Sequence, residues 1–210
     1  MNGDPIVLAY ATRDLKVLEA VVGLTPGREV VIQAGGSLGV WPKYLAHAFA
    51  RVYTFEPDPE LFRCLVHNAP EPNIYRYQAA LGEAPAFVGL SRARRDASGR
   101  ASHAGLTHTV GAGAVPTLRL DDFGFPACDL LYLDTEGSEL AILKGATATI
   151  ARCRPVIAVE INKNLTAVGL TPADVIDFLN RLGYVSLADY GSDRVFSPKD
   201  WPAGAWPGLS

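Results

Sequence analysis

The chain has 210 residues, of which 49% are hydrophobic and 20% are charged, and its formal net charge is −3. This length and composition predict one domain over residues 1–210, and the weak negative charge argues against a general affinity for nucleic acid or an anionic membrane. The three cysteines are widely spaced and include no C-x-x-C pair, which argues against a disulfide framework and a zinc site. The N-terminus lacks a basic region before an apolar run, and no uncharged apolar stretch could span a bilayer, so we expect a cytoplasmic protein.

The first half of the chain alternates between segments with helical periodicity and short apolar runs that are typical of strands. Asp58 and Pro59 are the residue types that favour a capped helix start. The predicted elements here are an N-terminal helical segment within residues 1–27, a strand over 29–33, a helix over 40–49, a strand over 51–56, a helix from 59 and a strand over 73–80.

Residues 91–114 interrupt this alternation. The segment reads SRARRDASGRASHAGLTHTVGAGA, which is rich in Arg, Ser, Gly and Ala and has little periodicity. We therefore predict a loop or hairpin insertion, and long insertions in compact domains are often functional.

The second half returns to the alternating pattern and predicts an α/β domain. Its predicted elements are a strand over 129–134, a helix over 138–150, a strand over 155–161, a helix from 172 that is closed by Gly183, two short strands near 184–188 and 194–196, and an irregular tail over 197–210. Strands that alternate with helices predict a Rossmann-like fold, with a mainly parallel sheet and helices on both faces.

In such sheets, ligands bind beyond the carboxyl ends of the strands. The polar residues that follow the apolar strands should therefore lie along one edge of the sheet. They are Gln33 with the glycine loop that ends at Gly39, Glu56, the 79–82 segment, the Asp134–Gly137 segment and Glu160.

The glycine loop has the spacing G-x-x-x-G from Gly35 to Gly39. A dinucleotide site favours G-x-G-x-x-G, but Ser37 occupies the middle position, and no GK[ST] follows to make a phosphate-binding P-loop. Glu56 ends the next strand 21 residues after Gly35, where a carboxylate can accept both hydroxyls of a ribose. The alternative role of Glu56, capping the following helix, is one that Asp58 already fills. This combination points to S-adenosylmethionine.

Six blocks of the chain extend this pattern: VIQAGGSLGVWPKYLA, VYTFEPDPELFRCLVHN, QAALGE, VPTLRLDDF, LLYLDTEGSELAILKGA and RPVIAVEIN. Over residues 29–162 their order and spacing resemble those of the FkbM-type methyltransferases. The resemblance implies a class I S-adenosylmethionine-dependent methyltransferase fold. It also implies methylation of a hydroxyl on a sugar or small metabolite.

The first motif of this family usually has an acid followed by V-G-A-N-x-G, whereas this chain has Gln33 in place of the acid and Gly36-Ser37 in place of Ala-Asn. The usual acid helps to hold the ammonium group of the cofactor, and a glutamine oxygen can accept that bond without the charge. The departure leaves open a catalytically silent binding module. The residues expected at the cofactor are Gln33, Gly35, Gly36, Ser37, Gly39, Glu56, Pro57, Gln78, Ala79, Ala80 and Asp134.

A hydroxyl acceptor must lose its proton during methyl transfer, which requires a base or a metal. The candidate catalytic residues are His103 and His108 in the 91–114 insertion, with Asp134 and Glu136 as alternatives. Glu160 could complete a carboxylate cluster on the substrate side, but spacing alone does not show that the acids converge, and we expect no metal.

Arg92, Arg94 and Arg95 gather in the same insertion. They are either a solvated charged segment or a substrate-binding element for an anionic acceptor, such as a phosphorylated sugar. A nucleotide or RNA methyltransferase is the alternative enzyme, but the chain lacks a wider basic surface. The [ND]-P-P-[YF] motif of amino-group methylation is absent, which favours oxygen as the acceptor atom.

Overall fold

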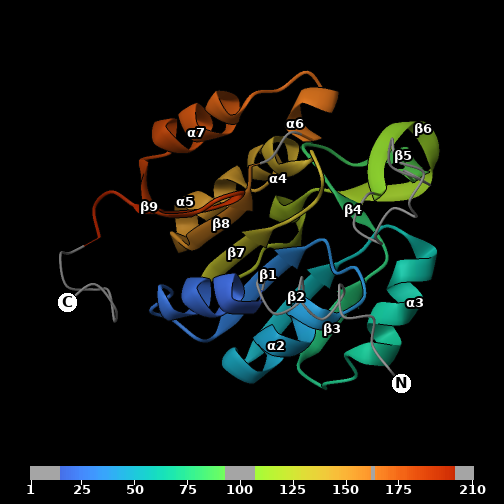
Figure 1. Ribbon diagram of the computed structural model, residues 1–210, viewed down its shortest axis with the longest axis horizontal. Helices are drawn as coiled ribbons and strands as arrows, with labels where there is room; N and C mark the ends of the chain where they lie inside the picture. The colour runs from blue at the N-terminus through green and yellow to red at the C-terminus, as the bar shows by residue number, and fades with distance from the viewer. Residues whose placement is uncertain (1–14, 93–106, 162–163, 202–210) are drawn as a thin grey trace.

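The computed structural model describes residues 15–92, 107–161 and 164–201. A seven-stranded sheet has the strand order β3-β2-β1-β7-β8-β10-β9 (Figure 1). The first five strands of this order are parallel to one another, and β10 runs antiparallel to both of its neighbours, β8 and β9. Its strands are β1 (Val30–Ala34), β2 (Arg51–Phe55), β3 (Ile74–Tyr77), β7 (Leu130–Leu133), β8 (Val156–Glu160), β9 (Tyr184–Tyr190) and β10 (Asp193–Pro198).

Helices cover both faces of this sheet (Figure 1). Alternate residues of a strand point to opposite faces, so Val31 packs with one apolar core and Ile32 with the other. One core contains side chains of a helix over residues 15–23, α2 (Val40–Ala48) and α3 (Pro59–Asn68). The other contains side chains of α4 (Glu139–Gly145), α5 (Thr147–Cys153), α6 (Asn164–Ala167), α7 (Pro172–Arg181) and the 3-10 helix η1 (Leu120–Phe123).

The chain changes direction across the sheet at β1. After β1 it builds β2 and β3 on one side, and later it returns to pair β7 with the other side of β1. Ligands of open α/β sheets bind at such a switch point, beyond the carboxyl ends of the strands. The segments after β1 and β7 are therefore the ones to search for a site.

The predicted Rossmann-like α/β fold is confirmed. One predicted helix start is confirmed as well, and one predicted helix differs from the structure. Asp58 caps α3 as expected, because its Oδ1 accepts hydrogen bonds from the amides of Glu60 and Leu61. The helix expected over 138–150 is instead divided into α4 and α5. A methyl group at Gly145 would lie 2.1 Å from the carbonyl oxygen of Gly82, so the chain comes too close to a neighbouring strand there for a larger side chain.

The 91–114 insertion is a hairpin at its described ends. β5 (Ala86–Arg92) pairs antiparallel with β6 (Thr107–Leu118), and β4 (Ala80–Leu81) adds a third strand. Of the two predicted alternatives, a loop or a hairpin, the described ends of the insertion form the hairpin. The small residues of this segment have a structural reason, since a methyl group at Gly113 would lie 2.4 Å from the Cα of Gly89 on the paired strand.

The remaining differences concern strand ends and helix length. The strand expected over 73–80 stops at Tyr77 and the chain then joins the small sheet at Ala80, while β10 continues to Pro198, inside the tail expected from residue 197. Trp201 packs against the core to which the 15–23 helix contributes. Among the described residues, no helix has both the length and the apolar character needed to cross a membrane.

Candidate functional site

The glycine loop lies directly against the segment that follows β7. The amides of Gly35 and Gly36 both donate to the carbonyl oxygen of Phe55, which ties the loop to β2. Gly35 has φ +91°, and a methyl group on it would lie 1.8 Å from the carbonyl oxygen of Asp134. Glycine is therefore required at position 35 by both backbone conformation and space. Gly39 also has a positive φ, of +88°, where the loop enters α2.

Gln33 is fully buried, and its side-chain hydrogen bonds hold the loop. Its Nε2 donates to the carbonyl oxygens of Ala34, at 3.2 Å, and Gly35, at 2.7 Å. Its Oε1 accepts from the hydroxyl of Thr54 at 2.5 Å. Because a carbonyl oxygen can only accept a hydrogen bond, it is the NH₂ group of the Gln33 side chain that faces these two carbonyls. The oxygen expected to accept from the cofactor ammonium group is thus directed to Thr54.

Gly36 and Ser37 complete this region. A methyl group on Gly36 would lie 2.9 Å from the Thr54 hydroxyl and 2.8 Å from Leu65, so the bare glycine leaves room for the hydroxyl that binds Gln33. Ser37 has φ +43° and donates its amide to Glu56.

Glu56 lies at the end of β2 with 4% of its surface exposed. Its Oε2 accepts from the Ser37 amide at 2.7 Å, and its Oε1 accepts from the Asp58 amide at 2.8 Å. Burial raises the pKa of Glu56, these two amides act in the opposite direction, and the negative charge of Asp58 adds to the rise. A carboxylate has about four acceptor positions, so two remain for a ligand.

The segment after β3 lies beside Glu56, because the Glu56 amide donates to the carbonyl oxygen of Tyr77 at 3.0 Å. Gln78 is exposed there, whereas Ala79 and Ala80 are buried. Pro57 is partly buried. These four residues of the expected cofactor set therefore belong to neighbouring segments at one edge of the sheet.

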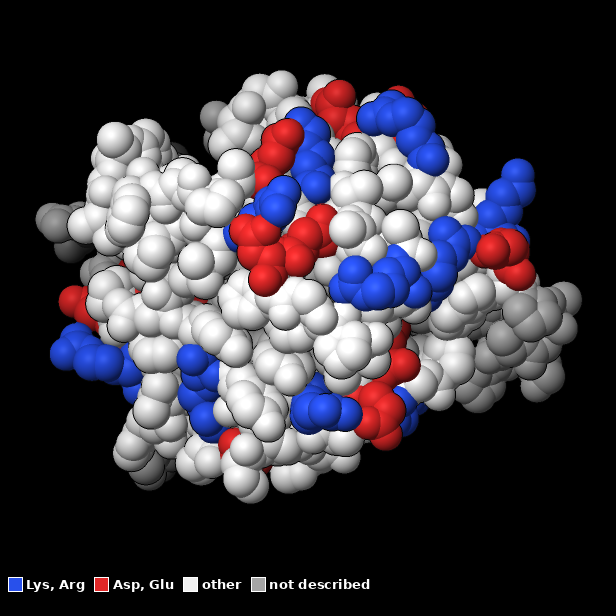
Figure 2. All heavy atoms as spheres, turned by 180° about the vertical axis from the view of Figure 1, so that it is seen from behind, with Lys and Arg blue, Asp and Glu red and all other residues white. Residues whose placement is uncertain are grey.

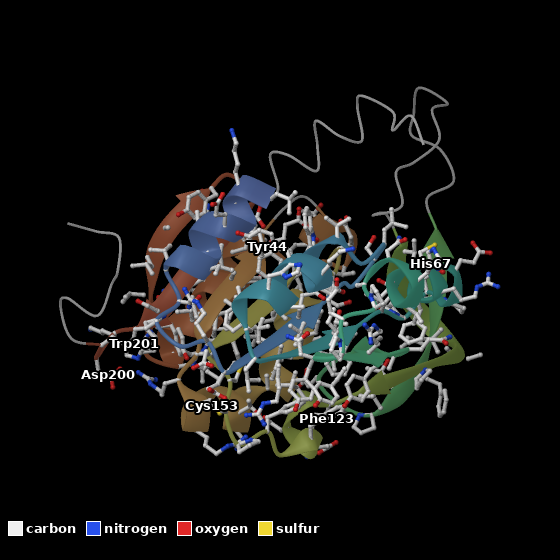
Figure 3. All side chains as sticks on the ribbon, turned by 90° about the horizontal axis from the view of Figure 1, so that it is seen from below. Tyr44, His67, Phe123, Cys153, Asp200 and Trp201 are labelled. Atoms are coloured by element: carbon white, nitrogen blue, oxygen red, sulfur yellow. The ribbon has the colours of Figure 1, made fainter. Side chains whose placement is uncertain are left out.

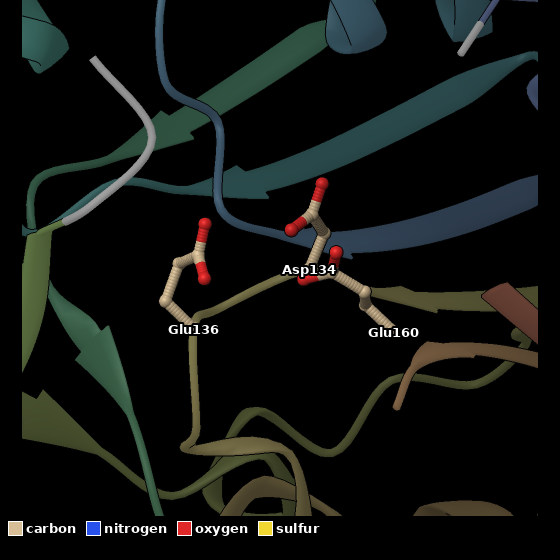
Figure 4. A group of neighbouring side chains, drawn as sticks. All are labelled: Asp134, Glu136 and Glu160. Carbon is tan, nitrogen blue, oxygen red and sulfur yellow. The ribbon is translucent and has the colours of Figure 1, made fainter. Parts of the chain in front are cut away.

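Three acids converge beyond the ends of β7 and β8. Carboxylate oxygens of Asp134, Glu136 and Glu160 all lie within 4.8 Å of one another, and Figure 4 shows the Asp134 and Glu160 carboxyl groups side by side with Glu136 facing them from the loop. Acid clusters of this spacing can hold a cation and also occur without one, so the expectation of no metal stays a prediction. The convergence that spacing alone did not establish is present.

Burial and the neighbouring carboxylates both raise the pKa of one acid in this cluster. Burial raises the pKa of Asp134 well above its usual range, and the nearby charges of Glu160 and Glu136 and a hydrogen bond with Glu160 raise it further. The charge of Asp193 contributes in the same direction. Asp193 begins β10 and pairs in register with Glu160. Sequence reasoning missed it because nothing in the short 194–196 run indicates an antiparallel neighbour of β8.

A second acid that sequence reasoning missed is Glu139, the first residue of α4. It is 1% exposed, and its carboxylate accepts from the amide and hydroxyl of Thr135 and from the amide of Gly137. The family resemblance includes this residue in its LDTEGSEL block, but spacing alone suggests only a helix-start acid.

The hairpin contacts the same loop. Thr109 on β6 lies 3.2 Å from Ser138, oxygen to oxygen, at the start of α4. His108 lies next to Thr109 on β6, and Arg92 ends β5, opposite Thr107. His103, Arg94 and Arg95 lie outside the described residues.

The described surface also carries two helical histidines and mixed charge. His47 on α2 is exposed. His67 on α3 is also exposed (Figure 3). On the face drawn in Figure 2, Lys and Arg side chains are interspersed with Asp and Glu. That face offers mixed charge rather than the continuous basic surface that favours nucleic acid.

Comparisons with known proteins establish the family and the fold of the chain. Residues 35–186 match the family model of the methyltransferase FkbM domain. A crystal structure of methyltransferase FkbM from Methylobacillus flagellatus aligns with 82% of this chain at 18% identity and a TM-score of 0.53. This chain spans 44% of that protein. A search of curated proteins gave no match.

Two other solved structures show the same fold. A S-adenosylmethionine-dependent O-methyltransferase from Thermotoga maritima has a TM-score of 0.54 at 11% identity, with 90% of this chain and 66% of that chain aligned. A putative methyltransferase from Streptococcus mutans, in complex with S-adenosylhomocysteine, has a TM-score of 0.51 at 10% identity, with 93% and 97% aligned. The fold is that of the class I methyltransferases, and the chain belongs to the FkbM family of S-adenosylmethionine-dependent methyltransferases.

Proposed function

We propose that the chain transfers a methyl group from S-adenosylmethionine to a hydroxyl oxygen of a sugar or another small metabolite. The observation that carries the proposal is the convergence of three acids, Asp134, Glu136 and Glu160, against the glycine loop. Bound S-adenosylmethionine supplies an electrophilic methyl group. The protein must then hold the cofactor, align an acceptor and remove the acceptor's proton.

Glu56 and the glycine loop fit the nucleoside part of the cofactor. Each oxygen of Glu56 accepts one backbone amide and keeps acceptor capacity for a ribose hydroxyl. Gln33 supports this end indirectly, because it fixes the carbonyls of Ala34 and Gly35. The cluster of acids offers negative charge to the cationic end of the cofactor.

The acid cluster also supplies the proton acceptor. A general base works best when its pKa is close to the working pH, and the pKa of Asp134 is raised by burial and by neighbouring carboxylates. We assign the base to the Asp134–Glu160 pair, which would take the proton of the acceptor hydroxyl onto a carboxylate oxygen. Glu136 is the alternative base. Of the histidine candidates, His103 is outside the described residues and His108 is placed only by its backbone in β6.

The acceptor would lie between the acid loop and the β5–β6 hairpin. Contact between Thr109 and Ser138 keeps the hairpin next to the loop that carries Glu136. Arg92 is the last residue of β5, at the side of the hairpin where the described residues stop. Because arginine binds carboxylates and phosphates, an anionic acceptor remains part of the proposal.

Calorimetric titration tests the cofactor half of the proposal. We expect S-adenosylmethionine and S-adenosylhomocysteine to bind, and Glu56→Ala to weaken both by about 100-fold or more, since it removes two hydrogen bonds to a charged group that are worth about 1.5–3 kcal/mol each. Glu29→Ala is the matched control, because Glu29 precedes β1 at the opposite end of the sheet and forms an exposed ion pair with Arg51. Normal binding by Glu56→Ala would refute the ribose assignment.

A methyl-transfer screen with labelled cofactor tests the acceptor class. Pooled sugars, phosphorylated sugars, nucleotides and RNA form its arms, and the proposal expects label in a hydroxyl-bearing small molecule. Label in RNA, together with salt-dependent RNA binding that is lost on changing Arg92, Arg94 and Arg95 to Ala, would support the nucleic-acid alternative instead. Absence of cofactor binding at high micromolar concentration would leave a silent binding module.

A further inference from the structure

The carboxylate of Glu139 is bound on both sides of Glu136. Thr135, immediately before Glu136, donates its amide at 3.0 Å and its hydroxyl at 2.9 Å to Oε1 of Glu139. Gly137, immediately after, donates its amide to Oε2 at 3.0 Å and to Oε1 at 3.2 Å. Residues 135 and 137 are thus attached to one buried carboxyl group, and Glu136 is the single residue between them.

Glu136 has a backbone conformation that its residue type disfavours. Its φ is +59°, in the left-handed region, and the following Gly137 has φ +116°. A left-handed conformation costs a non-glycine residue about 1–2 kcal/mol and persists only when surrounding contacts impose it. The bonds from Thr135 and Gly137 to Glu139 are contacts of this kind. The resulting turn directs the Glu136 carboxylate toward Asp134 and Glu160 (Figure 4).

Helix capping alone does not account for these bonds. An acid in the first turn stabilises a helix through the helix's own unpaired amides and its dipole. The amides that Glu139 accepts belong to Thr135 and Gly137, which precede α4. The carboxylate of Glu139 therefore holds the loop in front of the helix.

We propose that Glu139 is a positioning residue that fixes the left-handed turn at Glu136 and thereby sets the distance between Glu136 and the Asp134–Glu160 pair. The proposal rests on the proposed function, in which this group of acids faces the reacting atoms. Glu139 itself, at 1% exposure, acts through Glu136 and touches no substrate.

Amide hydrogen exchange tests the geometry without any need for an acceptor. In Glu139→Gln, the amide group keeps one acceptor oxygen but turns an NH₂ toward one of its present donors, so exchange at residues 135 and 137 should rise by about tenfold or more. Exchange in β1 and β7 should be unchanged. Glu83→Gln is the control, since Glu83 is an exposed acid that pairs with Lys144 of α4. Unchanged exchange at 135 and 137 in the folded variant would overturn the proposal.

Kinetics with the acceptor found in the screen test the route through Glu136. Glu139→Gln should lower kcat by about 10- to 100-fold while the affinity for S-adenosylmethionine changes by less than about threefold, because misplacing a reacting group by about 1 Å costs on this scale. Glu139→Ala should lose more than Glu139→Gln. A melting curve for each variant identifies any that fails to fold.

The double variant Glu136→Gln/Glu139→Gln separates positioning from a general structural role. If Glu139 acts through Glu136, the double variant should have the kcat of Glu136→Gln alone. If the two losses multiply, the proposal is wrong. A wild-type protein that binds no cofactor would refute the proposed function, whereas the exchange measurement would still decide whether Glu139 fixes the turn.

Discussion

Gln33→Glu is the most informative single change in the cofactor loop, because it restores the acid that the sequence motif leads one to expect. The structure predicts that this change is harmful. The Nε2 atom of Gln33 donates to the carbonyl oxygens of Ala34 and Gly35, and a glutamate oxygen at that place would face the same two acceptors. Only a protonated glutamic acid could donate there, and it could donate once.

The cost therefore depends on pH, and its sign follows from the pKa. Position 33 is 0% exposed, and fully buried glutamates reach a pKa of about 8, against about 4.3 in an unfolded chain. With the folded-state pKa raised, stability is greatest below the unfolded pKa and is lost as the pH rises toward the folded one. At about 1.4 kcal/mol per unit, Gln33→Glu should lose about 3–5 kcal/mol of unfolding free energy between pH 4.5 and 8.

Urea unfolding at several pH values, with wild type measured alongside, tests this reasoning. Gln33→Met is the matched control: it has a similar size and no charge, so its loss of stability relative to wild type should not change with pH. The expected result is a gap between Gln33→Glu and wild type that widens as pH rises. Equal stability at pH 8, or tighter binding of S-adenosylmethionine by Gln33→Glu, would show that residue 33 faces the cofactor ammonium group instead.

Three further changes test separate parts of the structure. Gly35→Ala should lower the unfolding free energy by about 3 kcal/mol or more, because the new methyl group meets the carbonyl oxygen of Asp134 and φ is positive. Denaturant unfolding measures this loss, and a value below about 1 kcal/mol would contradict the prediction. Asp58→Ala should cost about 1 kcal/mol through loss of the α3 cap, measured by the same method, and an unchanged midpoint would show that the cap is dispensable. The raised pKa of Asp134 makes wild-type stability fall as pH rises above about 3.9, the pKa of the unfolded chain. Asp134→Asn should flatten this decline by up to about 1.4 kcal/mol per pH unit, and an unfolding free energy with the same pH profile as wild type would refute the crowded-acid account.

Features that depend on one strand and its end could be predicted from the sequence. The Asp58 cap, the glycine loop and the acids at the ends of β7 and β8 follow from short patterns, because the carboxyl ends of parallel strands meet at one edge. The small sheet was harder to predict, because the glycine and alanine residues of β6 allow two backbones to approach closely and give no periodic hydrophobic pattern.

Features that depend on strand pairing or on an unusual backbone turn could not be predicted. The partner of Gln33 is Thr54, on the next strand, and only the paired register brings them together. Glu139 has the spacing of an ordinary first-turn acid, and its bonds to Thr135 and Gly137 become visible only with the turn between them. The deciding contact of Gln33 is tertiary, whereas those of Glu139 are local but depend on a backbone turn that the residue types do not reveal.

The antiparallel course of β10 gives one acid of the site an origin unlike the others. Asp134 and Glu160 lie at the ends of parallel strands, whereas Asp193 is the first residue of the antiparallel β10, directly after the turn that follows β9 and beyond the 35–186 span of the family match. A turn tolerates substitution and insertion more readily than a buried strand does. Changes at residues 191–192, next to Asp193, are therefore expected to alter the surroundings of the acid cluster while the parallel strands stay intact, which makes this turn a natural place for engineering.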